Sequence, residues 1–275
     1  MNEVLRGVLK ISAQGSIVIV VVLLVRLLLG KAPRKYICLL WILAGLRLLV
    51  PFHIESSLSL QPRLDLTGPV QAYGDLLGNI WIVGIAGMLF YSIVSYALLK
   101  WRLRESIRID GQIWESDRID TAFVLGYFQP RIYLPMSLSE AHRQMVLLHE
   151  QGHLKRMDHW LKLMGFMTLS VHWFNPVVWL GYVLYCWDTE LACDEAVVAS
   201  MDLAQRKGYS AALVACSSKR SYLTMTPVPF GDKPVRKRIR AVLNYREPGR
   251  IAGMVALVVT VILAVCFLTD PVMRK

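Results

Sequence analysis

Four long apolar stretches constrain the fold of this chain more than any other feature of its sequence. The first ends in residues 17–29, and the others cover residues 36–52, 80–99 and 251–268. Crossing a hydrocarbon core of roughly 30 Å takes about 20 helical residues, and each stretch can serve. Of the 275 residues 55% are hydrophobic and only 19% are charged, whereas globular domains carry about 25% charged residues. We therefore expect an α-helical membrane protein.

Basic residues orient these stretches, because they gather on one side of them. Lys31, Arg34 and Lys35 separate the first two stretches, and further basic clusters follow the third and precede the fourth. Between the second and third stretches Arg63 is the single Lys or Arg. Since cytoplasmic loops are enriched in Lys and Arg, the clusters predict the cytoplasmic side of a bacterial cell membrane.

The resulting layout is a multi-pass membrane protein with one domain inside the cell. It comprises two N-terminal transmembrane helices (residues 1–52), an extracellular loop (53–79), a third transmembrane helix (80–99), a cytoplasmic domain (100–250), a fourth transmembrane helix (251–268) and a short extracellular tail (269–275).

Charged residues near or within the apolar stretches allow two interpretations each. Arg26 and Arg47 could have a role inside the membrane, but we favour side chains that extend to the interface. The basic run at residues 233–240 could bind nucleic acid. Its position just before the last stretch favours contact with the anionic lipid bilayer, so we expect no direct nucleic-acid binding.

His149, Glu150 and His153 form a His-Glu-x-x-His motif. On a helix, residues four apart differ by about 40° in direction and roughly 6 Å in height, so both imidazoles can bind one Zn²⁺. Glu150 can then act as general base towards a zinc-bound water. The predicted reaction is hydrolysis of a peptide bond without a covalent enzyme intermediate. No His or Tyr is spaced so that it can be assigned to the oxyanion.

A catalytic zinc site needs a third protein ligand. Glu190 and Asp194 lie 41 and 45 residues after His149 and are again spaced i, i+4. We assign Glu190 as the third ligand, and Asp194 as a carboxylate that orients a ligating His. His172 is a further candidate, but a buried structural role is favoured, and His142 and His159 are interpreted as surface or supporting residues.

Residues 122–134 predict two short strands with a turn near Gln129 and Pro130. An edge strand beside the motif helix could pair with an extended substrate. A ribbon that merely covers the helix is an equally good interpretation.

Residues 160–187 form a fifth apolar stretch that could also cross the membrane. If it crossed, the two histidines and Glu190 would lie on opposite sides and could not share one zinc. Asn175 and Pro176 also interrupt a continuous helix. We therefore predict a helical hairpin that packs in the protease core or enters the inner leaflet, an inference that depends on Glu190 being a ligand.

The chain resembles the BlaR/MecR family of membrane zinc metallopeptidases. The resemblance rests on His-Glu-x-x-His at 149–153, His-Trp-Phe-Asn-Pro at 172–176, Glu-Leu-Ala-Cys-Asp at 190–194 and Pro-Arg-Ile-Tyr-Leu-Pro at 130–135. It implies a mainly α (α+β) gluzincin-like metalloprotease domain, with His149, His153 and Glu190 on zinc and Glu150 as base. It also implies signalling by cleavage of the protein itself or of a cytoplasmic winged-helix repressor.

The chain departs from this family at its C-terminus. The antibiotic sensors continue after the last span into a penicillin-binding domain, whereas this sequence stops at Lys275. Direct acylation by a β-lactam is therefore not expected, and the signal stays open. So does the scissile bond, for which residues 217–234 offer only a flexible candidate region.

Three functions remain for comparison. The leading hypothesis is a regulatory protease with a cytoplasmic protein substrate, which could form a homo-oligomer. The second is a housekeeping protease that degrades misfolded membrane proteins. The third is a non-catalytic receptor or scaffold with a structural zinc, and Glu150 speaks against it, since a structural site needs no general base.

Overall fold

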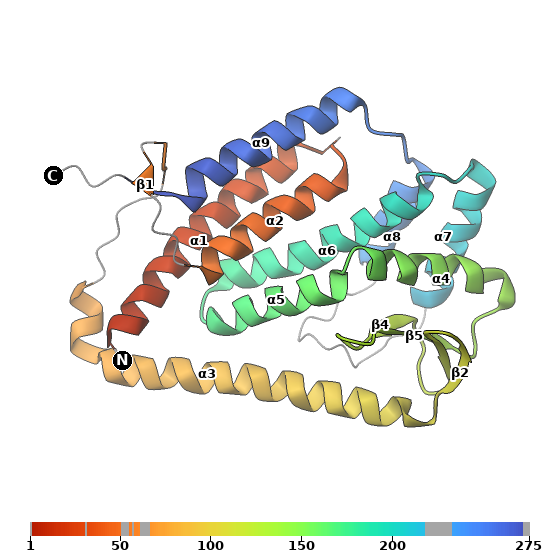
Figure 1. Ribbon diagram of the computed structural model, residues 1–275, viewed down its shortest axis with the longest axis horizontal. Helices are drawn as coiled ribbons and strands as arrows, with labels where there is room; N and C mark the ends of the chain where they lie inside the picture. Colours follow the sequence, from red (N-terminus) through yellow and green to blue (C-terminus); the bar gives the residue numbers. More distant parts are fainter. Residues whose placement is uncertain are drawn as a thin grey trace. The chain divides into compact units, whose positions relative to one another are not determined.

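The computed structural model describes residues 2–30, 32–50, 55–56, 58–60, 67–217 and 233–271. These residues are mainly helical, with a small sheet, as expected for the fold class (Figure 1). The chain divides into unit 1 (residues 1–89, 165–188 and 248–275) and unit 2 (residues 90–164 and 189–247).

Most of the strands lie in one stretch of the chain, between α3 and α4. The helices are α1 (Asn2–Leu28), α2 (Arg34–Leu49), α3 (Thr67–Arg102), η1 (Leu103–Glu105), α4 (Glu140–Lys155), α5 (Asp158–Val171), α6 (Pro176–Val198), α7 (Leu203–Ser217), α8 (Lys233–Leu243) and α9 (Arg250–Leu268). The strands are β1 (Glu55–Ser56), β2 (Ile107–Asp110), β3 (Ile113–Ser116), β4 (Phe123–Leu125), β5 (Arg131–Pro135) and β6 (Asp270–Pro271).

Among the described residues, three helical segments are long and apolar enough to cross a membrane: Asn2–Leu28, Gly74–Glu105 and Arg250–Leu268. They correspond to the first, third and fourth predicted spans. The second coincides with α2, whose 16 residues extend only about 24 Å at 1.5 Å per residue. Helix α3 begins at Thr67, so it includes part of the segment that the sequence predicted as an extracellular loop.

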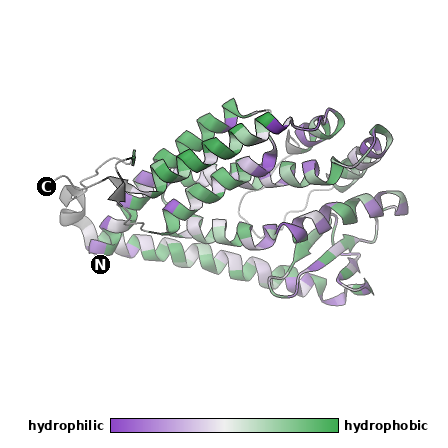
Figure 2. Cartoon of the chain, turned by 45° about the horizontal axis from the view of Figure 1, so that its top comes forward, coloured by the Kyte–Doolittle hydropathy of each residue, from purple (hydrophilic) through white to green (hydrophobic). Residues whose placement is uncertain are grey.

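Unit 1 is built from apolar helices, and hydrophobic residues dominate α1, α2 and α9 (Figure 2). Helix α1 packs along α2, and α2 packs along α9. A Cβ atom at Gly15 would lie 2.2 Å from Leu48 Cδ2, so a larger residue at this crossing of α1 and α2 would displace the buried Leu48 side chain. The close approach is typical of helices that associate in lipid through small residues.

Arg26 and Arg47, for which the sequence favoured side chains that extend to the interface, both pair with polar residues of unit 1. Arg26 donates two hydrogen bonds to Asp188, of 2.6 and 2.9 Å, and Trp41 Nε1 donates a third of 2.8 Å. Arg47 is buried and donates to Gln14 Oε1 over 2.6 Å. Each guanidinium finds a polar acceptor inside unit 1, because an unpaired charge among apolar helices is costly.

The fifth apolar stretch forms the predicted helical hairpin. Asn175 Oδ1 accepts a hydrogen bond from the Val177 backbone N–H (2.9 Å) and caps α6, which starts at Pro176, a position that favours proline. The rings of Phe166 and Tyr182 lie 6.4 Å apart across the hairpin. His172 is buried and its Nε2 lies 3.1 Å from the Leu48 carbonyl oxygen, which confirms a structural role. Residues 165–188 pack with the apolar helices of unit 1.

Unit 2 contains a four-stranded sheet of order β2-β3-β5-β4. The predicted ribbon is confirmed as the antiparallel pair β4–β5, while β3 pairs with β5 in parallel and β2 with β3 in antiparallel. Strand β5 is central, and its alternating side chains face two sides. Ile132 and Leu134 pack with Val146 of α4 and Ala212 of α7, whereas Tyr133 packs with a cluster around Leu99. The sheet thereby supports the motif helix.

Candidate metal centre

The two imidazoles of the His-Glu-x-x-His motif face each other on α4. His149, Glu150 and His153 are buried, and the Nε2 atoms of the two histidines lie 3.1 Å apart. This is the geometry that i, i+4 spacing predicts.

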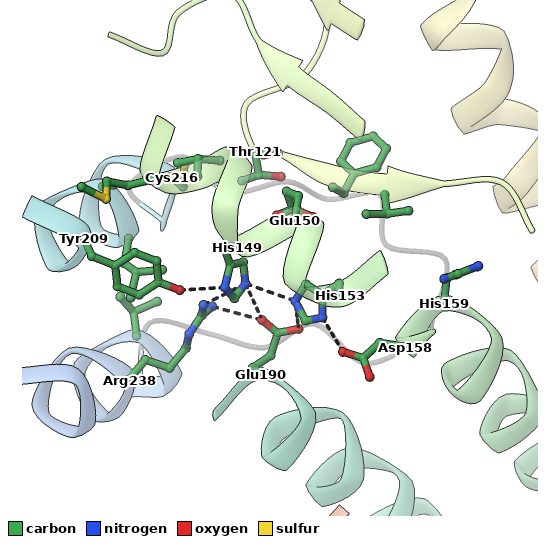
Figure 3. Close-up of a pocket in the computed structure, with 18 of the residues that line it drawn as sticks. Thr121, His149, Glu150, His153, Asp158, His159, Glu190, Tyr209, Cys216 and Arg238 are labelled. Carbon is green, nitrogen blue, oxygen red and sulfur yellow. Dashed lines mark hydrogen bonds and ion pairs between the residues drawn. The ribbon is translucent and has the colours of Figure 1, made fainter. Parts of the chain in front are cut away.

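Helix α6 brings Glu190 to the same point (Figure 3). Its Oε2 lies 3.4 Å from His149 Nε2, and its Oε1 lies 3.5 Å from His153 Nε2. Tetrahedral zinc with bonds of roughly 2.0–2.1 Å keeps its ligand atoms roughly 3.3–3.4 Å apart. The three side chains that the sequence assigned as ligands are therefore brought together at distances that fit a zinc ion.

The outer ring nitrogens of both histidines have acceptors. His153 Nδ1 lies 2.7 Å from Asp158 Oδ2, and His149 Nδ1 lies 2.7 Å from the Tyr209 hydroxyl. Tyr209 in turn donates to Asp194 Oδ1 over 2.7 Å. When both Nδ1 atoms act as donors, the lone pairs of both Nε2 atoms point towards the same position between the two rings. This arrangement favours a bound cation at that position.

Asp194 acts on His149 through Tyr209. The distance from Asp194 Oδ1 to His149 Nδ1 is 3.4 Å, and the Tyr209 hydroxyl bridges the two. The sequence predicted a carboxylate that orients a ligating His, and it identified neither the intermediate tyrosine nor the direct partner of His153, which is Asp158.

Two cations hold the Glu190 carboxylate in place. Lys162 Nζ lies 2.9 Å from Oε1, and Arg238 Nη1 lies 3.2 Å from Oε2. Burial works against ionisation, but the charges of Lys162 and His153 outweigh it and hold the pKa of Glu190 well below its usual range. Burial also lowers the pKa of His149, yet hydrogen bonds with Cys193 and Glu190 prevail and raise it to about 9.

Cys193 is a second candidate for the third ligand. Its Sγ and one nitrogen of each histidine all lie within 4.8 Å of one another. The thiol, however, donates to the His149 carbonyl oxygen over 3.3 Å and is packed below Gly152. Glu190 presents one oxygen to each Nε2 at ligand–ligand distance, so we favour Glu190, with Cys193 as a packing residue between α4 and α6.

A cavity of about 320 Å³ opens beside these residues. Its wall includes Glu150, His153 and Glu190, together with residues 121–124, which lead into strand β4, and Arg238 of α8. His159 also lines it, so this residue is not simply on the surface. Glu150, the predicted general base, therefore lines a cavity that can receive a substrate.

Four residues of the site were not predicted as members of it: Asp158, Lys162, Tyr209 and Arg238. Arg238 belongs to the basic run that the sequence assigned to lipid contact, although Arg236 and Lys237 beside it are exposed. Two apolar residues, Val235 three positions before Arg238 and Val242 four positions after it, would have indicated that one face of this run is buried. No sequence signal singled out Tyr209.

Residues 66–242 match the sequence profile described as BlaR1 peptidase M56. Regulatory protein BlaR1 of Bacillus licheniformis is 26% identical over 220 residues, which cover 70% of this chain and 37% of that protein. Methicillin resistance mecR1 proteins of Staphylococcus aureus and Staphylococcus epidermidis are 23% identical over 165 residues, which cover 52% of this chain and 28% of theirs. The chain thus matches well under half the length of these curated relatives.

Proposed function

Because the chain belongs to the BlaR1 peptidase M56 family, we propose that it is a membrane-bound, gluzincin-type zinc endopeptidase that acts by regulated cleavage of protein. The observation that carries the proposal is the convergence of His149 Nε2, His153 Nε2 and the Glu190 carboxylate beside a cavity that Glu150 lines. These three side chains would hold the zinc.

Zinc in this site would polarise the scissile carbonyl group and make a nearby water more acidic. The Glu150 carboxylate accepts the proton of the attacking water and then delivers it to the leaving amine nitrogen. Asp158 and the pair Tyr209–Asp194 keep both imidazoles in the tautomer that exposes Nε2. The buried position of Glu150 keeps its carboxylate out of bulk water, which favours proton transfer within the site.

Strand β4 supports an extended peptide as substrate. It is the last strand in the order β2-β3-β5-β4, so one of its backbone edges is not paired within the sheet. Thr121, Phe123 and Val124 also line the cavity. A peptide that adds to this edge would pass the Glu150 carboxylate, which favours the substrate-pairing interpretation of this ribbon over a mere cover.

From the basic clusters we infer that the protease acts on the cytoplasmic side, with a cytoplasmic protein such as a winged-helix repressor, or the protein itself, as substrate. Thiol labelling tests the side: a cysteine introduced by Asp110→Cys, at the exposed end of β2, should react with an impermeant reagent only after cells are opened. Reaction in intact cells would place the domain outside.

Replacement of Glu150 tests catalysis. In protein reconstituted with zinc, Glu150→Gln should retain the metal and lose cleavage of the protein itself and of proteins in a cytoplasmic extract, followed by mass spectrometry of new termini. Glu140→Gln is the matched control, since its side chain is on the same helix and is 89% exposed. Unchanged cleavage in Glu150→Gln would refute a catalytic role and favour a receptor or scaffold with a structural zinc.

The same measurement separates regulation from housekeeping. A regulatory protease should produce one or a few new termini and leave casein intact. Broad cleavage that includes casein would favour a housekeeping protease of membrane quality control.

A further inference from the structure

Arg238 is the charged residue of α8 that turns towards the metal centre. Its side chain is 16% exposed, whereas Arg236, Lys237 and Arg240 on the same helix are exposed. Val242 anchors α8 in a buried cluster with Tyr209 and Val198, which holds the helix against this part of unit 2.

Asp194 fixes the orientation of the Arg238 guanidinium group. Nε donates to Oδ2 over 2.7 Å, and Nη2 donates to Oδ1 over 2.8 Å. This two-point pairing is rigid, and the Asp194 side chain is only 3% exposed. Of the five N–H bonds of a guanidinium, two are used here, so three remain on the edge that is turned away from Asp194.

That edge of Arg238 faces the ligand atoms. Nη2 lies 3.1 Å from His149 Nε2, and Nη1 lies 3.2 Å from Glu190 Oε2. The Nε2 lone pair of His149 can bind either a metal ion or the N–H of Arg238. When Nε2 binds the metal, the Nη2 N–H of Arg238 is available to an oxygen atom in the cavity. Arg238 also lines this cavity. In Figure 3, Arg238 and Glu150 approach the ligand cluster from different sides.

We propose that Arg238 is a catalytic residue that donates hydrogen bonds to the carbonyl oxygen of the scissile peptide bond and stabilises the negative charge that develops on it. The inference rests on the proposed function and adds the oxyanion partner to it. A prepositioned cation is effective in this role because it needs no reorganisation when the charge forms. The ion pair with Asp194 offsets the cost of burying the guanidinium group of Arg238 at this position.

The other donors of the cavity are less suited to this role. The Tyr209 hydroxyl donates to Asp194 and contacts His149 at Nδ1, on the side of the ring that faces away from Glu190. Lys162 is bound to Glu190 Oε1. His159 lines the cavity as well, but burial lowers the pKa of its imidazole, which leaves it uncharged at neutral pH.

The test compares Arg238→Gln and Arg238→Lys with Arg236→Gln, a control with the same charge change at an exposed position of the same helix. Zinc affinity is measured by competition with a chelating dye, and binding of acetohydroxamate to the zinc-loaded protein by calorimetry. Arg238→Gln should leave zinc affinity within about threefold and weaken acetohydroxamate about tenfold or more, because the bound anion loses its cationic partner. Arg238→Lys should lie between, since a lysine keeps the charge but not the fork, and Arg236→Gln should match wild type.

A peptide selected from a quenched fluorescent library for cleavage by the wild-type protein gives a second measure. With this peptide, Arg238→Gln should lower kcat about 100- to 1,000-fold with little change in KM. If Arg238→Gln does not fold, the same measurements are made on Arg238→Lys, for which we expect smaller losses of acetohydroxamate binding and of kcat.

Two results would overturn the proposal. If zinc affinity shifts strongly in Arg238→Gln while acetohydroxamate still binds the loaded site normally, Arg238 only positions the ligands. If His159→Gln causes the loss of acetohydroxamate binding and the Arg238 variants do not, the role belongs to His159. A wild-type protein that binds no zinc would instead refute the proposed function, so the two failures can be told apart.

Discussion

Gly152 lies where α4 meets α6, and its replacement by alanine tests the packing that assembles the metal centre. A Cβ atom at this position would lie 2.8 Å from Cys193 Sγ and 3.5 Å from Val197 Cγ2. Cys193 is fully buried and hydrogen-bonded to the His149 carbonyl oxygen. The sulfur therefore has little room to move, and the two helices must separate.

The size of the effect follows from these distances. The Cβ of Gly152→Ala is about 0.6 Å short of the separation at which ordinary contact begins, and such overpacking costs about 1–3 kcal/mol in the free energy of unfolding. Better helix propensity offsets about 0.5–1 kcal/mol of this. Since Glu190 is on α6 and both histidines are on α4, the same shift exceeds the roughly 0.2 Å tolerance of a metal site. We expect zinc affinity to fall about 10- to 100-fold.

The assay is a double-mutant cycle with Cys193→Ala. Zinc affinity is read by chelator competition, and unfolding by circular dichroism in detergent. In Gly152→Ala/Cys193→Ala the obstructing sulfur is gone and the nearest remaining contact, Val197, is at an ordinary distance, so zinc affinity should return close to that of Cys193→Ala alone. Wild-type zinc affinity and stability in Gly152→Ala would refute the helix packing. Loss of zinc in Cys193→Ala would instead identify the cysteine, and not Glu190, as a ligand.

Two further predictions concern the histidines. Tyr209→Phe removes the hydroxyl between His149 and Asp194, which should weaken zinc binding about 10- to 100-fold and lower the free energy of unfolding by about 1–3 kcal/mol. Chelator competition and denaturation measure these two effects. The control is Tyr245→Phe, which alters another tyrosine near this cluster and should change neither quantity. The pKa of His149 is raised to about 9; burial works to lower the pKa of His153, but the charge of Glu190 outweighs it and raises that pKa. Zinc must therefore displace protons from both imidazoles, so zinc affinity should rise by about 10- to 100-fold per pH unit across neutral pH. The metal-free protein has the opposite dependence: His149 contributes full stability below its ordinary pKa of 6.5 and loses it as the pH rises through 9. A zinc affinity independent of pH would contradict this titration.

The motif helix and its nearest partners were predictable because their signals are local. His149 and His153 follow from i, i+4 spacing on one helix, and Glu190 follows because zinc requires a third ligand. The break at Asn175 and Pro176 also follows from residues that disfavour a continuous helix.

The remaining members of the site depend on tertiary structure. Asp158 reaches His153 because the chain reverses at Met157, a non-glycine residue with φ of 56°, and no turn residue announces that reversal. Arg238 is one of several basic residues in a row, and only the packing of α8 decides which of them is buried. The pairing of Arg26 could not be predicted because its partner, Asp188, is 162 residues away in the sequence.

That separation between Arg26 and Asp188 has a consequence for how the protein is made. At roughly 5–20 residues per second, a ribosome needs roughly 8 to 30 s to add the chain between them, and α1 is present throughout with a guanidinium that lacks its carboxylate. Arg26 lies in the last turn of α1, so its long side chain can reach the polar interface while it lacks its partner. The two-point pairing of Arg26 with Asp188 can form only after α6 has been synthesised. The ion pair thus makes the fixing of α1 against α6 a late step of assembly, which follows the synthesis of the helix that carries Glu190.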